Sequence, residues 1–176
     1  GTGWHHVSYY AHLLNRNADR ALEYLSEIIT KPLLRQEDFN RQKRIITDEA
    51  KGRLSSINYL GWQELNKLYF ENQRYHTSAV GSPDEVADIT LEDIISFYDD
   101  TYFPGATILV TAGPTDHRQL NDMVNNYFGS WRSGKSSKQD NLWLNPIIRS
   151  GDQFSNFTSP LAEQATVRMI KPGPSD

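Results

Sequence analysis

Glu49 is the residue whose type and position first suggest chemistry. It lies in RQKRIITDEAKGR, residues 41–53, a stretch with helical periodicity in which three apolar side chains share one side: Ile45, Ile46 and Ala50. A carboxylate beside such a stripe is costly unless a cation or a hydrogen bond compensates it. Two interpretations follow from the residues alone: Glu49 is a metal ligand, or it is a half-exposed glutamate paired with Lys51 or Arg53.

The histidines offer no comparable candidate for a metal site. His6 and His12 share one face of a predicted strand, but at ~3.3 Å per residue they are roughly 20 Å apart, too far to bind one ion. The chain contains no cysteine, which excludes thiolate metal sites. It also contains no G-x-S-x-G motif and no glycine loop long enough to hold a phosphate, which argues against a serine hydrolase and a nucleotide-binding protein.

Length and charge narrow the class of protein further. The 176 residues, 38% of them hydrophobic, suit one domain with an ordinary core. The net charge of -4 argues against a nucleic-acid partner. No apolar run approaches the ~20 residues of a membrane span, and the first residues lack a signal-peptide pattern. The compartment stays unknown, and we expect any targeting signal to lie upstream of this chain.

Periodicity predicts the elements that position Glu49. Alternating or β-branched residues predict three strands: residues 7–13, 106–113 and 163–170. Helical periodicity covers five stretches: residues 17–32, about 36–52, 59–70, 89–102 and 116–131. Thr90 and Asp93 form a capping signal for the fourth helix. This order predicts an α+β fold, with a mixed, mainly antiparallel sheet and helices packed on one face.

Five segments, taken in chain order, resemble the insulinase or pitrilysin family of zinc metallopeptidases, which includes the mitochondrial processing peptidase. They are HHVSYYAHLL, RALEYLSEIITKPLL, FNRQKRIITDEAKGR, the run from YHTSAVGSPDE to ILVTAG, and LNDMVNNYFGSW. The resemblance implies a metallopeptidase-like α+β domain over residues 1–131, truncated at its N-terminus. Residues 132–176 would then be a connection and the start of a following metallopeptidase-like domain. The role of residues 132–159 stays open.

The resemblance also implies a role for Glu49. In this family two histidines of an H-x-x-E-H helix bind zinc, and the glutamate of that motif activates water. A glutamate on a later helix, in a segment of the form ER-x-x-V-I-x-x-E, is the third ligand. The corresponding segment here is QKRIITDE, which places Glu49 on the ligand position. Gln42 stands seven residues earlier, where the family often has a second glutamate that supports the zinc or its water.

No H-x-x-E-H motif occurs in the 176 residues, so we assign no catalytic residue to this chain. We expect the chain alone to bind no zinc and to cleave nothing, and zinc to be a cofactor of the complete parent protein if that protein carries the motif. The resemblance then implies a zinc-dependent metalloendopeptidase that hydrolyses extended peptides in an enclosed chamber. The alternative is a noncatalytic homologue that serves as a peptide-binding or assembly subunit. Gln42 favours the alternative, and Glu49 favours the enzyme.

The first residues are the expected substrate contact. In the family, the segment leading into the strand that resembles residues 2–10 lies beside the zinc and offers its edge to an extended peptide. This implies substrate-binding positions at four residues: Thr2, Gly3, Trp4 and His5. The partners implied are a peptide substrate and a second metallopeptidase-like domain or homologous subunit.

Overall fold

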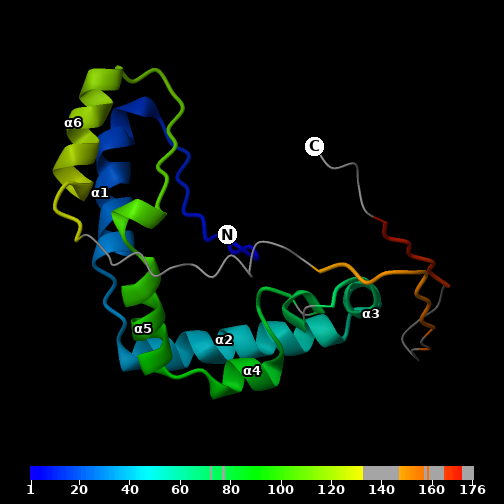
Figure 1. The fold of residues 1–176 in the computed structure, drawn as a ribbon. Helices are drawn as coiled ribbons and strands as arrows, with labels where there is room; N and C mark the ends of the chain where they lie inside the picture. The colour runs from blue at the N-terminus through cyan, green and yellow to red at the C-terminus, as the bar shows by residue number, and fades with distance from the viewer. Residues whose placement is uncertain (72, 77, 133–146, 157, 159–164, 172–176) are drawn as a thin grey trace. The chain divides into compact units, whose positions relative to one another are not determined.

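The chain folds into two compact units built from helices (Figure 1). The structure is a computed structural model that describes residues 1–71, 73–76, 78–132, 147–156, 158 and 165–171. Unit 1 comprises Gly1–Asp38 and Thr90–Asp140, and unit 2 comprises Phe39–Ile89 and Asn141–Asp176. Each unit is described by itself. Within the described ranges, no helix is long and apolar enough to cross a membrane.

Unit 1 contains three α-helices and two short 3-10 helices: α1 (Ala18–Thr30), α5 (Leu91–Thr101), α6 (His117–Phe128), η1 (Asn15–Asn17) and η3 (Pro104–Ala106). Helices α1 and α6 lie side by side (Figure 1). Leu22 and Ser26, one turn apart on α1, are the buried residues of that helix. The Tyr127 hydroxyl of α6 donates to the Asp19 carboxylate of α1 at 2.9 Å.

The predicted helices of unit 1 are confirmed, and their ends follow local signals. The Thr90 hydroxyl accepts from the Asp93 backbone N–H at 3.2 Å, and the Asp93 carboxylate accepts from the Thr90 N–H at 2.8 Å. This is the capping box expected before α5. Asn17, the residue before α1, makes no side-chain capping bond, and the 3-10 turn η1 leads into the helix instead.

Unit 2 contains most of α2 (Gln36–Leu54), followed by α3 (Ile57–Tyr69), η2 (Gln73–His76) and α4 (Pro83–Asp88). The five helices predicted from the sequence do not include α4, although its start carries a capping signal. Ser82 and Glu85 form a reciprocal capping box, and Pro83 occupies the first helical turn. Gly81 precedes this box with a φ of 81°, a left-handed conformation that favours glycine.

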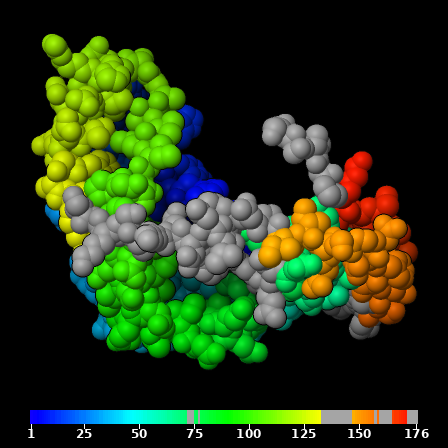
Figure 2. Space-filling view, in the orientation of Figure 1, coloured from blue at the N-terminus to red at the C-terminus, as the bar shows by residue number. Residues whose placement is uncertain are grey.

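Two later segments of unit 2 attach to the end and the side of α3. The Arg149 N–H donates to the Tyr69 carbonyl, and the Glu71 N–H donates to the Ile147 carbonyl, both at 2.8 Å. The Arg168 guanidinium donates to the Asn58 side chain at 2.8 Å and lies over the ring of Trp62, at 5.1 Å from its centroid. Residues 147–149 and Arg168 therefore contact α3 or its end, and orange residues of this part of the chain border the teal ones in the space-filling view (Figure 2).

The predicted α+β fold with a mixed, mainly antiparallel sheet is wrong for the part of the chain that the structure describes. That part is helical and contains no strand, and its β pairing consists of two isolated bridges, Thr2 with Val7 and Phe70 with Ile148. Residues 8–14, 107–112 and 165–171 have no regular secondary structure, although their patterns predicted strands. Residues 163 and 164 of the third predicted strand lie outside the described residues.

These three segments do not form strands for a simple physical reason. A strand is stable when its backbone N–H and C=O groups bond to a neighbouring strand, and residue alternation supplies no such neighbour by itself. Gly3 N–H donates to His6 O, and Ser8 N–H donates to Gly1 O, both at 2.8 Å, so the first eight residues fold back on themselves. Farther along, Ile108 and Met169 are 88% and 92% exposed. These segments have the composition of strands without the pairing that makes a sheet.

Candidate metal-ligand face of α2

Glu49 lies on the solvent-facing side of α2 and its carboxylate is held by its own helix. Arg53 Nη2 donates to Glu49 Oε1 at 2.7 Å, one turn further along α2. The side chains of Arg53 and Glu49 are 38% and 50% exposed. The contact to Arg53 was one of the two interpretations of Glu49, and it is present. An exposed pair at this spacing contributes about 0.3–0.5 kcal/mol, so it gives the fold little reason to require Glu49.

The burial predicted next to Glu49 is confirmed for Ala50 and wrong for the two isoleucines. Ile45 is 53% exposed and Ile46 is also exposed, whereas Ala50 is 2% exposed. The side of α2 that packs is a different stripe, spaced by three or four residues: Phe39, Lys43, Thr47 and Ala50. Glu49 therefore stands on the open side of the helix, where a carboxylate costs little.

Gln42 is exposed on the same helix. Seven residues are close to two helical turns, so Gln42 and Glu49 lie on one side of α2. An amide at position 42 offers a neutral oxygen and N–H donors, in contrast to the second carboxylate that the resemblance implies. Gln42 can therefore hydrogen-bond a neighbouring group but adds no negative charge to this face.

Lys43 is a functional candidate that the sequence interpretation missed. Its Nζ donates to the carbonyls of Ala87 at 2.5 Å and Ile89 at 2.6 Å, which lie at the C-terminal end of α4. It also lies over the Phe39 ring, at 5.6 Å from the centroid. The sequence signal that could have identified Lys43 is its spacing: it stands four residues before Thr47 and seven before Ala50, on the side of the helix that packs.

The four expected substrate-binding residues lie in a local turn of unit 1. Thr2 pairs with Val7, and Trp4 and His5 form the bend between the two paired segments. A Cβ added at Gly3 would come within 3.1 Å of the His6 ring, so Gly3 permits a close approach. The function of these four residues stays a prediction.

One carboxylate oxygen of Glu49, on the exposed side of α2, suits a zinc ligand. Glu49 Oε1 is bound to Arg53, while Oε2 has no hydrogen-bond partner among the described residues. A carboxylate oxygen is a suitable zinc ligand, but zinc sites in proteins use three or four ligands. In the described ranges, no group of three His, Asp or Glu side chains is arranged to hold a metal ion. The residues present thus fit one ligand of a zinc site and do not form a complete site.

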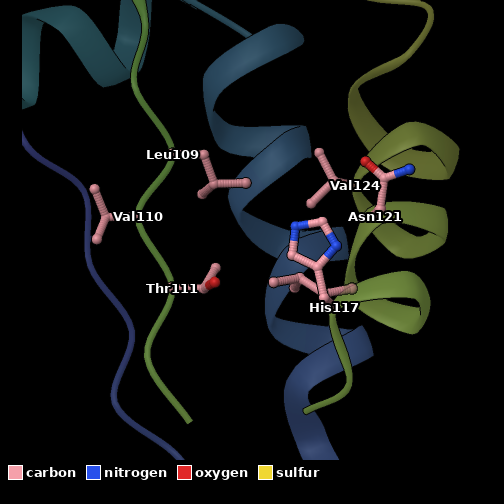
Figure 3. A pocket seen from close by; sticks show the side chains of 7 residues that line it. Leu109, Val110, Thr111, His117, Asn121 and Val124 are labelled. Atoms are coloured by element: carbon pink, nitrogen blue, oxygen red, sulfur yellow. The ribbon is translucent and has the colours of Figure 1, made fainter.

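Unit 1 has a groove of a different character between residues 109–111 and α6 (Figure 3). Its volume is about 450 Å³, and it is open to solvent. Leu109, Leu120 and Val124 give it apolar walls, and His117 and Asn121 are polar residues from α6. No carboxylate lines it to orient or charge His117, so the groove has no acid–base pair.

Comparison with known proteins identifies two family models along the chain. Residues 2–78 match the model described as "Insulinase (Peptidase family M16)". Residues 88–176, half of the chain, match the model described as "Peptidase M16 inactive domain". Glu49 and Gln42 fall within the first match.

Curated relatives and a solved structure give similar matches. An "Uncharacterized zinc protease" of Rickettsia felis is 26% identical over 77% of this chain and 33% of its own length. "Cytochrome b-c1 complex subunit 1, mitochondrial" of Bos taurus is 24% identical over 91% of this chain and 34% of its own length. A crystal structure of a protease from Helicobacter pylori shares the fold with a TM-score of 0.64, at 20% identity over 69% of this chain and 30% of that protein. The chain thus spans about a third of the length of these proteins.

Proposed function

The chain belongs to the insulinase family of peptidases, and on this premise we propose that it is part of a zinc-dependent metalloendopeptidase in which Glu49 is a zinc ligand. The other ligands and the general base would be the H-x-x-E-H residues of the complete protein, since that motif is absent from these 176 residues. The domain division at residue 131 and the substrate positions Thr2–His5 belong to the same proposal.

The state of the Glu49 carboxylate is the observation that carries this proposal. The side chain is half-exposed, one oxygen is fixed by Arg53, and the other oxygen is accessible. The pair with Arg53 lies within α2, so this bond does not join two elements of the fold. The family match over residues 2–78 and the zinc protease relative support a metal role for it.

Each residue of the proposed site has a defined task. Bound zinc would polarise the scissile carbonyl of a peptide and lower the pKa of a water molecule. Glu49 would supply one carboxylate oxygen, and Gln42, on the same side of α2, would hydrogen-bond groups near that oxygen. The N-terminal residues Thr2–His5 would contact an extended peptide through their backbone. Its partner would be a second metallopeptidase-like domain or a homologous subunit.

Gln42 supports a second candidate, a noncatalytic subunit that binds peptides or assists assembly. The neutral amide replaces the carboxylate expected near zinc, and one relative is named as a subunit of the cytochrome b-c1 complex. A complete protein of this kind would keep the fold and bind no zinc at Glu49.

Zinc analysis of the complete protein separates the two candidates. Glu49→Gln removes the charged oxygen while keeping the shape of the side chain, so we expect loss of bound zinc and of peptide hydrolysis with an unchanged fold. The matched control is Asp48→Asn, which makes the same charge change at the next residue, also exposed, and should keep one zinc per chain. A full zinc equivalent in the Glu49→Gln protein, or none in the unaltered protein, contradicts the proposal.

A further inference from the structure

Lys43 joins two segments of unit 2 that are far apart in sequence. Its Nζ donates to the Ala87 carbonyl at 2.5 Å and to the Ile89 carbonyl at 2.6 Å, 44 and 46 residues away. Both acceptors lie where α4 ends, at carbonyls that have no N–H of a following helical turn. A cation at this position bonds those carbonyls and matches the negative end of the helix.

The same contact lies on the side of α2 that packs. Lys43, Thr47 and Ala50 are four and three residues apart, so their side chains lie on one side of the helix. Thr47 is half-buried and Ala50 is buried on this side. Ile45 and Ile46 are exposed, so these two isoleucines do not select the rotation of α2 about its axis, and Lys43 shares the packed side with Ala50 and the half-buried Phe39.

We propose that Lys43 is a positioning residue that sets the rotation of α2 and thereby presents Glu49 to the metal. This inference rests on the proposed function of Glu49. The bonds of Lys43 to the end of α4 hold one side of the helix inward. Glu49, six residues later and about a third of a turn around the helix, is directed outward as a result. The Nζ touches neither Glu49 nor any group that reacts, so its effect passes through the helix.

Zinc affinity of the complete protein tests the consequence for Glu49. We expect Lys43→Met, which keeps the length of the side chain and removes its charge and donors, to weaken zinc binding about tenfold in competition with a chelator. Lys43→Arg retains the charge and donors and should restore affinity to within about threefold of the unaltered protein. Lys51→Met, on an exposed position of α2, is the matched control and should leave zinc affinity unchanged.

A thiol probe tests the rotation of α2 without zinc. Ala50→Cys places a thiol at a buried position, and its labelling rate can be read from its own peptide by mass spectrometry. We expect slow labelling alone and with Lys51→Met, and labelling at least tenfold faster with Lys43→Met, because α2 then exposes its packed side.

The two measurements distinguish the possible failures. Slow labelling with Lys43→Met means that α2 is held without this lysine and overturns the inference, whatever the protein does with zinc. Fast labelling with unchanged zinc affinity overturns the link from Lys43 to Glu49. Zinc retained by Glu49→Gln contradicts the proposed function itself, while the labelling rates still decide whether Lys43 sets the rotation of the helix.

Discussion

Tyrosine hydroxyls make several of the bonds that join elements of unit 1, where Arg132 also pairs with Asp99 of α5, whereas lysine and arginine side chains join elements of unit 2. In unit 1, Tyr98 donates to the Ile29 carbonyl at 2.8 Å, and the hydroxyls of Tyr9 and Tyr102 lie 2.9 Å apart. Burial raises the pKa of Tyr98 and of Tyr102 above the ordinary value near 10, so both hydroxyls are neutral at physiological pH. These bonds connect α5 to the end of α1 and to the N-terminal segment.

In unit 2 the corresponding bonds come from lysine and arginine. Lys43 bonds the end of α4, Arg168 bonds Asn58 of α3, and Arg149 donates from Nε to the Lys67 carbonyl at 3.3 Å. Glu49 differs from these charged residues because Arg53, its ion-pair partner, lies on the same helix. Charged side chains of unit 2 therefore hold its elements together, and Glu49 is not needed for that purpose.

The largest effect should come from charging the packed side of α2. We expect Ala50→Asp to lower the free energy of unfolding by about 3 kcal/mol, because a carboxylate enters a position that is now 2% exposed. Ile45→Asp on the exposed side of the same helix is the control and should change it by less than about 0.5 kcal/mol. Denaturant unfolding measures both, and equal losses would contradict the observed packing of α2.

The neutral bonds of unit 1 should make that unit sensitive to alkaline pH. Burial, and next the hydrogen bond with Tyr9, raise the pKa of Tyr102 above its ordinary value near 10. A raised pKa in the folded state means that this contribution to stability is complete below pH 10 and is lost as the pH rises towards the folded-state pKa.

Tyr102→Phe tests this pH dependence. At neutral pH the variant should lose about 1 kcal/mol with the hydrogen bond to Tyr9, and its stability should fall less steeply above pH ~10 than that of the unaltered chain. Tyr10→Phe, at a highly exposed position, is the control. Denaturation between pH 7 and 11 measures the slopes, and parallel curves for all three proteins would contradict the contribution of Tyr102.

The smallest effect should come from the pair on the open side of α2. Arg53→Ala and Glu49→Gln should each change the free energy of unfolding by less than about 0.5 kcal/mol, since the pair is exposed and one turn apart. Thermal unfolding in low and high salt measures it. A loss of more than 1 kcal/mol in the free energy of unfolding would mean that Glu49 stabilises the fold. Glu49 would then no longer differ from Lys43, which joins two elements of unit 2.

The helices could be predicted from local signals, whereas the lack of a sheet among the described residues could not. Thr90 with Asp93 and Gly129 after α6 identify helix ends, and the same rule applied to Ser82 and Glu85 would have found α4. The side-chain pattern of residues 107–112 suits a strand. A sheet also needs a neighbouring strand to pair with, and the pattern does not specify one.

The candidate site was predictable in part. The family resemblance points to Gln42 and Glu49, the spacing of seven places them on one side of a helix, and that helix is confirmed. The exposure of Gln42 and Glu49 was not predictable. The neighbouring Ile45 and Ile46 are apolar residues of the kind found in a core, but they are not packed. The bonds of Lys43 join residues 44 and 46 positions apart, a separation over which periodicity carries no information.

Zinc-edge anomalous diffraction from crystals of the complete protein tests the role of Glu49 most directly. We predict an anomalous zinc peak about 2.0–2.2 Å from one carboxylate oxygen of Glu49, the distance of a zinc–carboxylate bond. A zinc peak bound elsewhere, or crystals soaked in zinc in which Glu49 contacts Arg53 and no metal, would contradict the account.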